Sequence, residues 1–347
     1  MAELRRDYFT DRMTIISPER MKRPREFKSA AKEGGGECDF CPGNEERTPP
    51  ADLVLVEREG SLLKLSDSEG EIIRNWRVRV FPNKYPAVSL SDLGSYSDHP
   101  LYSEPAYGYH YVVVATPNHD EAFSEMSVEQ WSNVLTIVQD KVRWLYGKKR
   151  VSYVSVFINY GRGAGATLSH PHLQLVTLPR LPPIIEHEAQ AVHRSMSELG
   201  VCPMCSVINM EMNGPRQILA TEFFLAFCPW APRHSYEYWI FPKKHQVSFL
   251  RVSQKEIRDL AVILRSTLGG LADALNDPPF NLVFHTSSEK KTTRQIHWHI
   301  EVYPQLEMWA GLERGSGVYV VQAPPEQAAE VLGAAARKEL AEVVGIA

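Results

Sequence analysis

Apolar residues recur at helical spacing over residues 128–147 of this chain. Intervals of three and four place them on one side of an α-helix, which is predicted to pack against a core. The positions concerned are Trp131, Val134, Leu135, Val138, Val142 and Leu145. Two more helices are predicted, one over residues 254–276 and one over residues 325–344, a segment rich in Ala and Glu.

Short runs of β-branched and aromatic residues between turn signals predict strands. They cover residues 76–81, 109–116, 153–159 and 170–178 in the first half, and residues 223–227, 236–241, 281–286 and 296–303 in the second. Residues 88–106 are rich in Ser, Gly and Pro and predict a loop, and residues 1–37 predict a short extended segment with a polar loop. Because strands outnumber helices and short turns join them, each half predicts an antiparallel sheet with a packed helix, an α+β fold.

One set of motifs occurs twice in the same order. The first copy is Cys38-x-x-Cys41, then Pro-x-His119, then His170-Pro171-His172; the second is Cys202-x-x-Cys205, then Pro-x-x-His245, then His297-Trp298-His299. In each copy a serine with a capping partner three residues later begins the intervening helix. These pairs are Ser127 with Gln130 and Ser253 with Glu256. The repeat predicts two domains, residues 1–195 and residues 196–347.

Each copy supplies two thiolates and two imidazoles, which is a typical Cys₂His₂ zinc set. The first set is Cys38, Cys41, His119 and His170, and the second is Cys202, Cys205, His245 and His297. We therefore expect two zinc ions per chain. The alternatives are disulfides or a redox Cys-x-x-Cys pair, but a redox pair usually begins a helix, and Pro42-Gly43-Asn44 after the first pair favours a turn. The fifth cysteine, Cys228, lies in an apolar run and predicts a buried thiol.

Composition narrows the function classes. Hydrophobic residues make up 44% of the chain and charged residues 23%, as in globular proteins. The formal charge of −4 and the absence of a Lys/Arg block argue against nucleic acid as a partner. Apolar runs are too short for a membrane span, and the N-terminal residues lack the apolar segment of a signal peptide. A cytoplasmic protein is expected.

A second chemical signal lies beside the second histidine motif of the first half. His170 and His172 are two residues apart on a predicted strand, so both side chains are expected on the same face. The glycine-rich residues 161–167 precede them and can bind phosphate oxygens through backbone N–H groups. A neutral imidazole at His172 would attack a phosphate, and Gln174 would donate a hydrogen bond to the transferred group. The alternative for these residues alone is a metal-binding or core strand.

The second half differs at the corresponding place. Residues 286–294 lack glycine and are rich in Ser, Thr and Lys. His299 is therefore not expected to act as a nucleophile, so one half catalyses and the other supports it.

Together these motifs resemble the galactose-1-phosphate uridylyltransferase family of the histidine-triad superfamily. The matching residues are Ser17-Pro18-x-Arg20-x-x-Arg23-Pro24, Cys38-x-x-Cys41-Pro42-Gly43-Asn44, Asn83, Pro117-x-His119, Asn159-x-Gly161, His170-Pro171-His172-x-Gln174 and Pro242-x-x-His245. The resemblance implies two histidine-triad-like halves that share one extended sheet, usually in a homodimer. It also implies a ping-pong reaction, in which His172 takes the nucleotidyl group from UDP-glucose and passes it to galactose 1-phosphate.

The resemblance assigns further residues. It implies nucleotide contacts from Arg20, Arg23, Asn83, Asn159, Gly165 and Thr167, with Gln174 steadying the transferred group. In one branch of the family a glutamate and three histidines hold iron at the second site. Glu188, His245, His297 and His299 could imitate that set, although the nearby cysteine pair favours zinc.

Two departures bear on the substrate. Well-studied bacterial members have Asn-Asp-Phe where this chain has Asn83-Lys84-Tyr85, and they carry a different hexose-binding segment in place of residues 312–319. Residues 312–319 and the sequence Asn276-Asp277-Pro278-Pro279 look more like the ADP-glucose phosphorylase branch. The leading hypothesis is UMP transfer from UDP-glucose to galactose 1-phosphate. The runner-up is a phosphorylase of ADP-glucose or another nucleotide sugar. A dinucleotide hydrolase and a non-catalytic, zinc-stabilised binding protein complete the alternatives.

Overall fold

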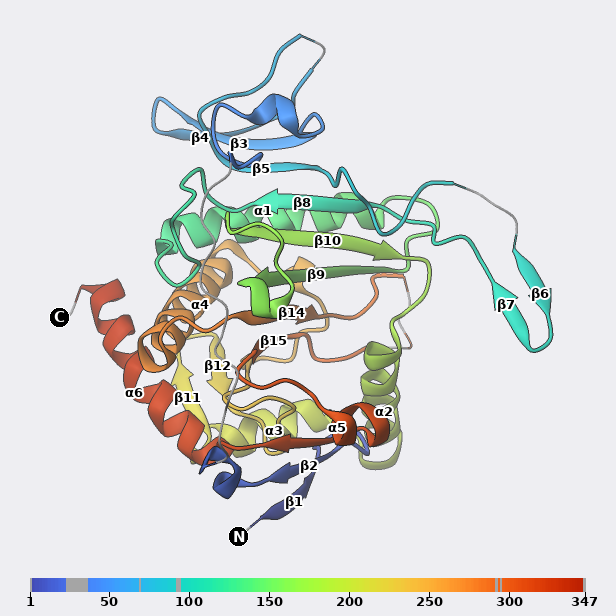
Figure 1. Ribbon diagram of the computed structural model, residues 1–347, viewed down its shortest axis with the longest axis vertical. Coiled ribbons are helices and arrows are strands. Elements are labelled where there is room, and N and C mark those ends of the chain that lie inside the picture. Colours follow the sequence, from blue (N-terminus) through green and yellow to red (C-terminus); the bar gives the residue numbers. More distant parts are fainter. Residues whose placement is uncertain are drawn as a thin grey trace.

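The computed structural model describes residues 2–22, 37–68, 70–91, 95–290, 293 and 295–345. Arg23, one of the expected nucleotide contacts, lies outside the described residues. The described chain is α+β, as predicted, and one large sheet runs through both halves (Figure 1).

The large sheet has 11 strands in the order β11-β12-β13-β15-β14-β9-β10-β8-β5-β3-β4. The second half contributes β11 (Gln217–Ala220), β12 (Phe224–Phe227), β13 (Tyr238–Pro242), β14 (Phe280–His285) and β15 (His299–Pro304). The first half contributes β3 (Leu53–Arg58), β4 (Ser61–Leu65), β5 (Trp76–Pro82), β8 (His110–Val114), β9 (Tyr153–Tyr160) and β10 (His172–Leu178).

The two halves meet in the middle of this sheet, where β9 pairs antiparallel with β14. Outward from that pair the strand orders correspond, with β10, β8 and β5 on one side and β15, β13 and β12 on the other. The motif repeat in the sequence is therefore a repeat in space, and a site in one half has a counterpart in the other.

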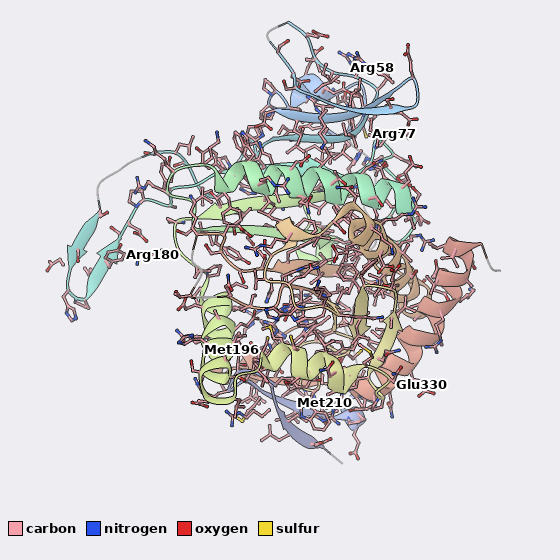
Figure 2. The ribbon with its side chains drawn as sticks, turned by 180° about the vertical axis from the view of Figure 1, so that it is seen from behind. Arg58, Arg77, Arg180, Met196, Met210 and Glu330 are labelled. Atoms are coloured by element: carbon pink, nitrogen blue, oxygen red, sulfur yellow. The ribbon has the colours of Figure 1, made fainter. Side chains whose placement is uncertain are left out.

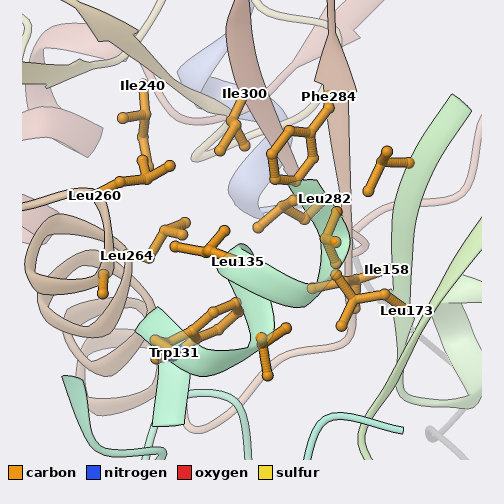
Figure 3. Close-up of a cluster of buried hydrophobic side chains, with 14 of the residues drawn as sticks. Trp131, Leu135, Ile158, Leu173, Ile240, Leu260, Leu264, Leu282, Phe284 and Ile300 are labelled. Carbon is orange, nitrogen blue, oxygen red and sulfur yellow. The ribbon is translucent and has the colours of Figure 1, made fainter. Parts of the chain in front are cut away.

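Two helices cover one face of the sheet across both halves. They are α1 (Val128–Tyr146) and α4 (Gln254–Leu275), and α6 (Pro325–Val344) packs against α4 and β11. Figure 3 shows apolar side chains of α1 and α4 meeting those of the strands. The labelled residues are Trp131, Leu135, Ile158, Leu173, Ile240, Leu260, Leu264, Leu282, Phe284 and Ile300. The apolar stripe predicted from the sequence is therefore the central core.

The opposite face differs between the halves. In the second half it is covered by α2 (Pro183–Leu199) and α3 (Pro203–Glu211), whose apolar residues pack on β12 and β13. In the first half that face has a smaller core, and the glycine-rich turn η3 (Arg162–Ala164) lies in front of the strands (Figure 1). Seen from behind in Figure 2, α1 lies in front of the same strands, so the glycine-rich turn and α1 occupy opposite faces.

The remaining elements lie around the sheet. The strands β1 (Glu3–Arg6), β2 (Met13–Ile16) and β16 (Val318–Val321) form a small separate sheet, near η1 (Pro18–Lys22) and α5 (Gly311–Ser316). Two short 3₁₀ turns complete the chain, η2 (Glu45–Arg47) and η4 (Phe249–Arg251). No helix among the described residues combines the length and apolar composition needed to cross a membrane.

Three local expectations need correction. The predicted loop over residues 88–106 contains a hairpin, β6 (Tyr96–Asp98) and β7 (Leu101–Ser103), which projects from the body (Figure 1). The strand predicted to begin at His170 begins at His172, because Pro171 has no N–H group to donate. Of the two predicted capping boxes, the second is confirmed, because Ser253 and Glu256 form a full capping box.

The third correction concerns the first predicted capping box, which is only half formed. Ser127 accepts from the backbone of Gln130, as expected. The Gln130 amide, however, donates to the backbone carbonyls of Arg77 and Ala115 instead of reaching back to the cap.

Candidate active site and metal centres

The first predicted ligand set comes together at the start of β10. The ligand atoms of Cys38, Cys41, His119 and His170 all lie within 4.8 Å of one another. Cys41 Sγ is 3.3 Å from His119 Nδ1 and 3.6 Å from His170 Nδ1. His170 Nε2 lies 2.8 Å from the Thr116 carbonyl oxygen, to which it donates, so Nδ1 keeps its lone pair for a metal ion.

Burial shifts the pKa values of two members of this set. Burial, followed by the neighbouring Cys38 thiol, raises the pKa of Cys41 to about 11. Burial lowers the pKa of His170 to about 4, which keeps its imidazole neutral. Two crowded thiols and two imidazoles fit a soft divalent ion such as zinc.

The second predicted set also comes together. Cys202, Cys205, His245 and His297 place their ligand atoms within 4.8 Å of one another. Cys205 Sγ is 3.2 Å from His245 Nδ1 and 3.5 Å from His297 Nδ1. A hydrogen bond from Cys205 lowers the pKa of Cys202 to about 6, so a thiolate is already favoured. Unlike the first pair, this pair begins a helix, because Cys202 is the N-cap residue of α3.

The residues that could imitate an iron site do not converge. His245 and His297 join the cysteines, whereas Glu188 and His299 lie in a separate buried group. There His285 Nδ1 is 2.8 Å from Glu188 Oε1, and His299 Nε2 is 3.3 Å from Glu301 Oε1. The Arg233 guanidinium donates to Glu301 at 2.6 Å. This group is a hydrogen-bonded network of opposite charges in the second half.

That network occupies the place in the second half that His172 occupies in the first. His299 Nδ1 is 3.1 Å from the His297 carbonyl oxygen. The His299 ring stacks on the Phe241 ring, with 4.3 Å between the ring centroids. Both ring nitrogens of His299 therefore face polar partners within the second half.

His172 has the opposite arrangement. Its Nδ1 lies 2.8 Å from the His170 carbonyl oxygen and donates to it, so Nε2 carries the free lone pair. Burial lowers the pKa of His172, which keeps the ring neutral near pH 7. The Phe40 ring lies edge-on to the His172 ring, with 5.3 Å between the ring centroids, and helps to fix the imidazole plane. His172 thus presents a neutral imidazole in a fixed orientation.

Two side-chain amides flank this imidazole. Gln174 is two residues further along β10 and shares its face. The ladder between β9 and β10 ends at Ile158 and Leu173, so Asn159 is the next residue beside His172. Ile158 and Leu173 point into the helix-covered core. Because side chains alternate along a strand, His172, Gln174 and Asn159 lie on the opposite face.

The remaining expected nucleotide contacts divide into two groups. Gly165 and Thr167 lie on the exposed loop after Asn159, where Gly165 has a φ of 87°, a conformation that favours glycine. Asn83 lies beside His110, with its Nδ2 3.2 Å from His110 Nε2. Arg20 lies in η1, which follows β2 of the small separate sheet, outside the large sheet that carries His172.

Sequence reasoning missed two residues of the site, His110 and Asn281. His110 contacts Gln174, and Asn281 contacts Asn159. Neither belongs to a repeated motif, and only the pairing of strands brings them to the site. Their alternation on β8 and β14 gave the only signal, and it does not distinguish them from ordinary surface residues.

Similarity to known proteins extends over most of the chain. A family model described as a domain of unknown function, DUF4921, matches residues 107–343. ADP-glucose phosphorylase of Arabidopsis thaliana is 31% identical over 95% of this chain and 92% of its own length. Galactose-1-phosphate uridylyltransferase of Thermotoga maritima is 30% identical over 96% of this chain and 98% of its own length.

A solved structure of the Arabidopsis thaliana phosphorylase with bound ADP-glucose superposes with a TM-score of 0.81. It has 28% identity and covers 96% of this chain and 99% of its own.

Proposed function

This chain belongs to the galactose-1-phosphate uridylyltransferase family, and we propose that it transfers a nucleotidyl group through a covalent intermediate on His172. The observation that carries the proposal is the free lone pair of His172 Nε2, fixed by the bond from Nδ1 to the His170 carbonyl. The donor is a nucleoside diphosphate hexose. Family membership supports nucleotidyl transfer, and the arrangement around His172 supports this residue as the nucleophile.

The reaction has two steps of the same kind. The His172 Nε2 lone pair attacks the α-phosphorus, an N–P bond forms, and the bond to the bridging oxygen breaks. Hexose 1-phosphate leaves with that electron pair. A phosphate oxygen of the acceptor then attacks the same phosphorus, and the N–P bond breaks. Asn159 and Gln174 donate hydrogen bonds to the phosphoryl oxygens as negative charge develops on them.

The acceptor distinguishes two forms of this activity. If it is galactose 1-phosphate and the donor is UDP-glucose, the chain is a uridylyltransferase. If it is inorganic phosphate and the donor is ADP-glucose, the chain is a phosphorylase. The second form is favoured by Lys84 in place of the aspartate of the bacterial enzymes and by residues 312–319. Relatives of both names match at nearly equal identity.

The metal ions have a supporting role in this proposal. We propose zinc at both Cys₂His₂ sets, where it would brace the strand ends and remain outside the chemical steps. At the first set it would hold His170, whose carbonyl orients His172.

One assay tests the activity. The protein is mixed with UDP-glucose or ADP-glucose without acceptor, and intact mass reports an added UMP or AMP. Galactose 1-phosphate, phosphate or buffer alone is then offered, and the released nucleotide is identified. Wild type should gain one nucleotidyl group, and His172→Asn should gain none. An adduct that persists in His172→Asn would falsify the assignment, and release into buffer alone would indicate a hydrolase.

A further inference from the structure

Asn281 lies where the two halves of the sheet meet. It belongs to the second half, on β14, and its residue partner on β9 of the first half is Asn159. Asn281 Nδ2 donates to Asn159 Oδ1 at 2.8 Å and to the Ala164 backbone carbonyl at 2.9 Å. One amide of the supporting half therefore contacts both the substrate-facing strand and the glycine-rich loop.

The direction of these hydrogen bonds is fixed by chemistry. The Ala164 carbonyl can only accept, so the Asn281 group that faces it must be the amide nitrogen. On its other side, Asn281 Oδ1 accepts from Gln305 Nε2 at 2.8 Å. The backbone N–H of Gln305 is held in turn by the Pro279 carbonyl at 2.7 Å. Both ends of the Asn281 amide are thus assigned independently of Asn159.

The orientation of Asn281 fixes that of Asn159. Because Asn281 donates a hydrogen bond to Asn159, the Asn159 side chain must present its oxygen to Asn281. The amide NH₂ of Asn159 is then left for another partner. Asn159 is the residue beside His172, on the face where the nucleophile lies. An amide turned the other way would present an oxygen to an anionic phosphoryl group and repel it.

We propose that Asn281 is a positioning residue of the nucleotidyl-transfer site, supplied by the second half. It holds Asn159 with its NH₂ toward the transferred phosphoryl group and holds the glycine-rich loop through the Ala164 carbonyl. This inference rests on the proposed function. It gives the supporting half a specific role in the reaction, beyond bracing the sheet.

The variants separate this role from packing. Asn281→Ala removes both donors. Asn281→Asp keeps the shape and can still accept from Gln305, but it can donate to neither partner. Asn159→Ala removes the group through which Asn281 is proposed to act. Gln139→Ala is the matched control, because Gln139 is a buried amide that also joins the halves, donating to the Phe249 and Val252 carbonyls from α1.

The measurement is the single-turnover rate of adduct formation on His172, with thermal midpoints recorded for every variant. We expect Asn281→Ala and Asn281→Asp to slow the rate about tenfold, as loss of an orienting partner typically does. Asn159→Ala should cost roughly a hundredfold. In the double variant, Asn281→Ala should add less than about threefold to Asn159→Ala, because the two residues act as one unit. Gln139→Ala should keep the wild-type rate.

Three outcomes would overturn the inference while the proposed function stands. They are wild-type rates in both Asn281 variants, full additivity in the double variant, or an equal loss in Gln139→Ala. Absence of an adduct in wild type with either nucleotide sugar would overturn the proposed function, and the inference with it.

Discussion

Nε2 of His110 lies 2.8 Å from Oε1 of Gln174. His110 Nδ1 accepts from the Ala87 backbone N–H at 3.1 Å, so Nε2 carries the proton and donates to Gln174. Asn83 Nδ2 also approaches His110 Nε2, but it is a donor itself, because its Oδ1 accepts from the Tyr85 N–H. The Gln174 oxygen is therefore occupied, and no described residue accepts a hydrogen bond from its NH₂, which we expect to face the phosphoryl group.

This orientation predicts the effect of changing Gln174. Gln174→Ala should keep the fold and lower kcat by about a hundredfold, because one donor to the developing charge is lost. Gln174→Glu should do at least as much, since a carboxylate can still accept from His110 but adds a negative charge. Steady-state kinetics and thermal midpoints check both variants. A kcat within twofold of wild type would make Gln174 only a strand residue.

The two cysteine pairs should respond differently to substitution. Cys41→Ser should lower thermal stability and slow adduct formation, by ~tenfold or more, because His170 of the same site orients His172. Cys205→Ser should lower thermal stability with a smaller effect on the rate measured well below the midpoint. Similar rate losses in both variants would contradict this division of roles.

Metal analysis of the purified protein counts the zinc ions bound per chain. Both Cys₂His₂ sets are assembled, so purified protein should contain two zinc ions per chain by mass spectrometry. Removal by a chelator should lower the thermal midpoint, and zinc should restore it. One zinc per chain, or iron at the second set, would refute the paired zinc sites.

The glycine-rich loop should be sensitive at Gly161 for a steric reason. A Cβ at Gly161 would lie 2.8 Å from Pro279 Cβ, and φ there is 77°. Gly60 has a similar φ of 73° with nothing within 4 Å of an added Cβ, in the turn between β3 and β4 at the edge of the sheet. Gly161→Ala should therefore slow adduct formation, whereas Gly60→Ala should change only stability. Equal rates for the two variants would mean that contact with Pro279 does not shape the loop.

The buried network of the second half predicts a pH dependence of stability. Burial alone would lower the pKa of His285, but the carboxylates of Glu188 and Glu301 outweigh it and raise this pKa. A raised folded-state pKa stabilises the protein fully below the unfolded value, about 6.5. This contribution is lost as the pH rises through the folded-state value.

Denaturant unfolding between pH 6 and 9 measures that loss. Wild type should lose unfolding free energy toward high pH, and His285→Gln should be less stable at low pH with a flatter dependence. His187→Gln, at an exposed position on the same helix as Glu188, is the control and should follow wild type. A wild-type slope retained in His285→Gln would assign the effect to another group.

The sequence by itself determined the helices α1, α4 and α6, the strands of the large sheet from β12 to β5, and the candidate chemistry. The α1 and α4 stripes are read from periods of three and four, because a helix repeats its faces over neighbouring residues. Both ligand sets and the nucleophile candidate follow from motifs repeated at matching spacing. These features depend on residues close in the chain or on side-chain chemistry that is the same in any fold.

Tertiary structure alone decided how these elements serve one site. The pairing of β9 with β14 brings Asn281 to Asn159, and the pairing of β8 with β10 brings His110 to Gln174. The helices α2 and α3 cover one face of the sheet in the second half. Such contacts join segments that are far apart in the chain. The direction of each hydrogen bond depends on the other groups that the fold brings next to the side chain. A local sequence pattern predicts neither the contacts nor these directions.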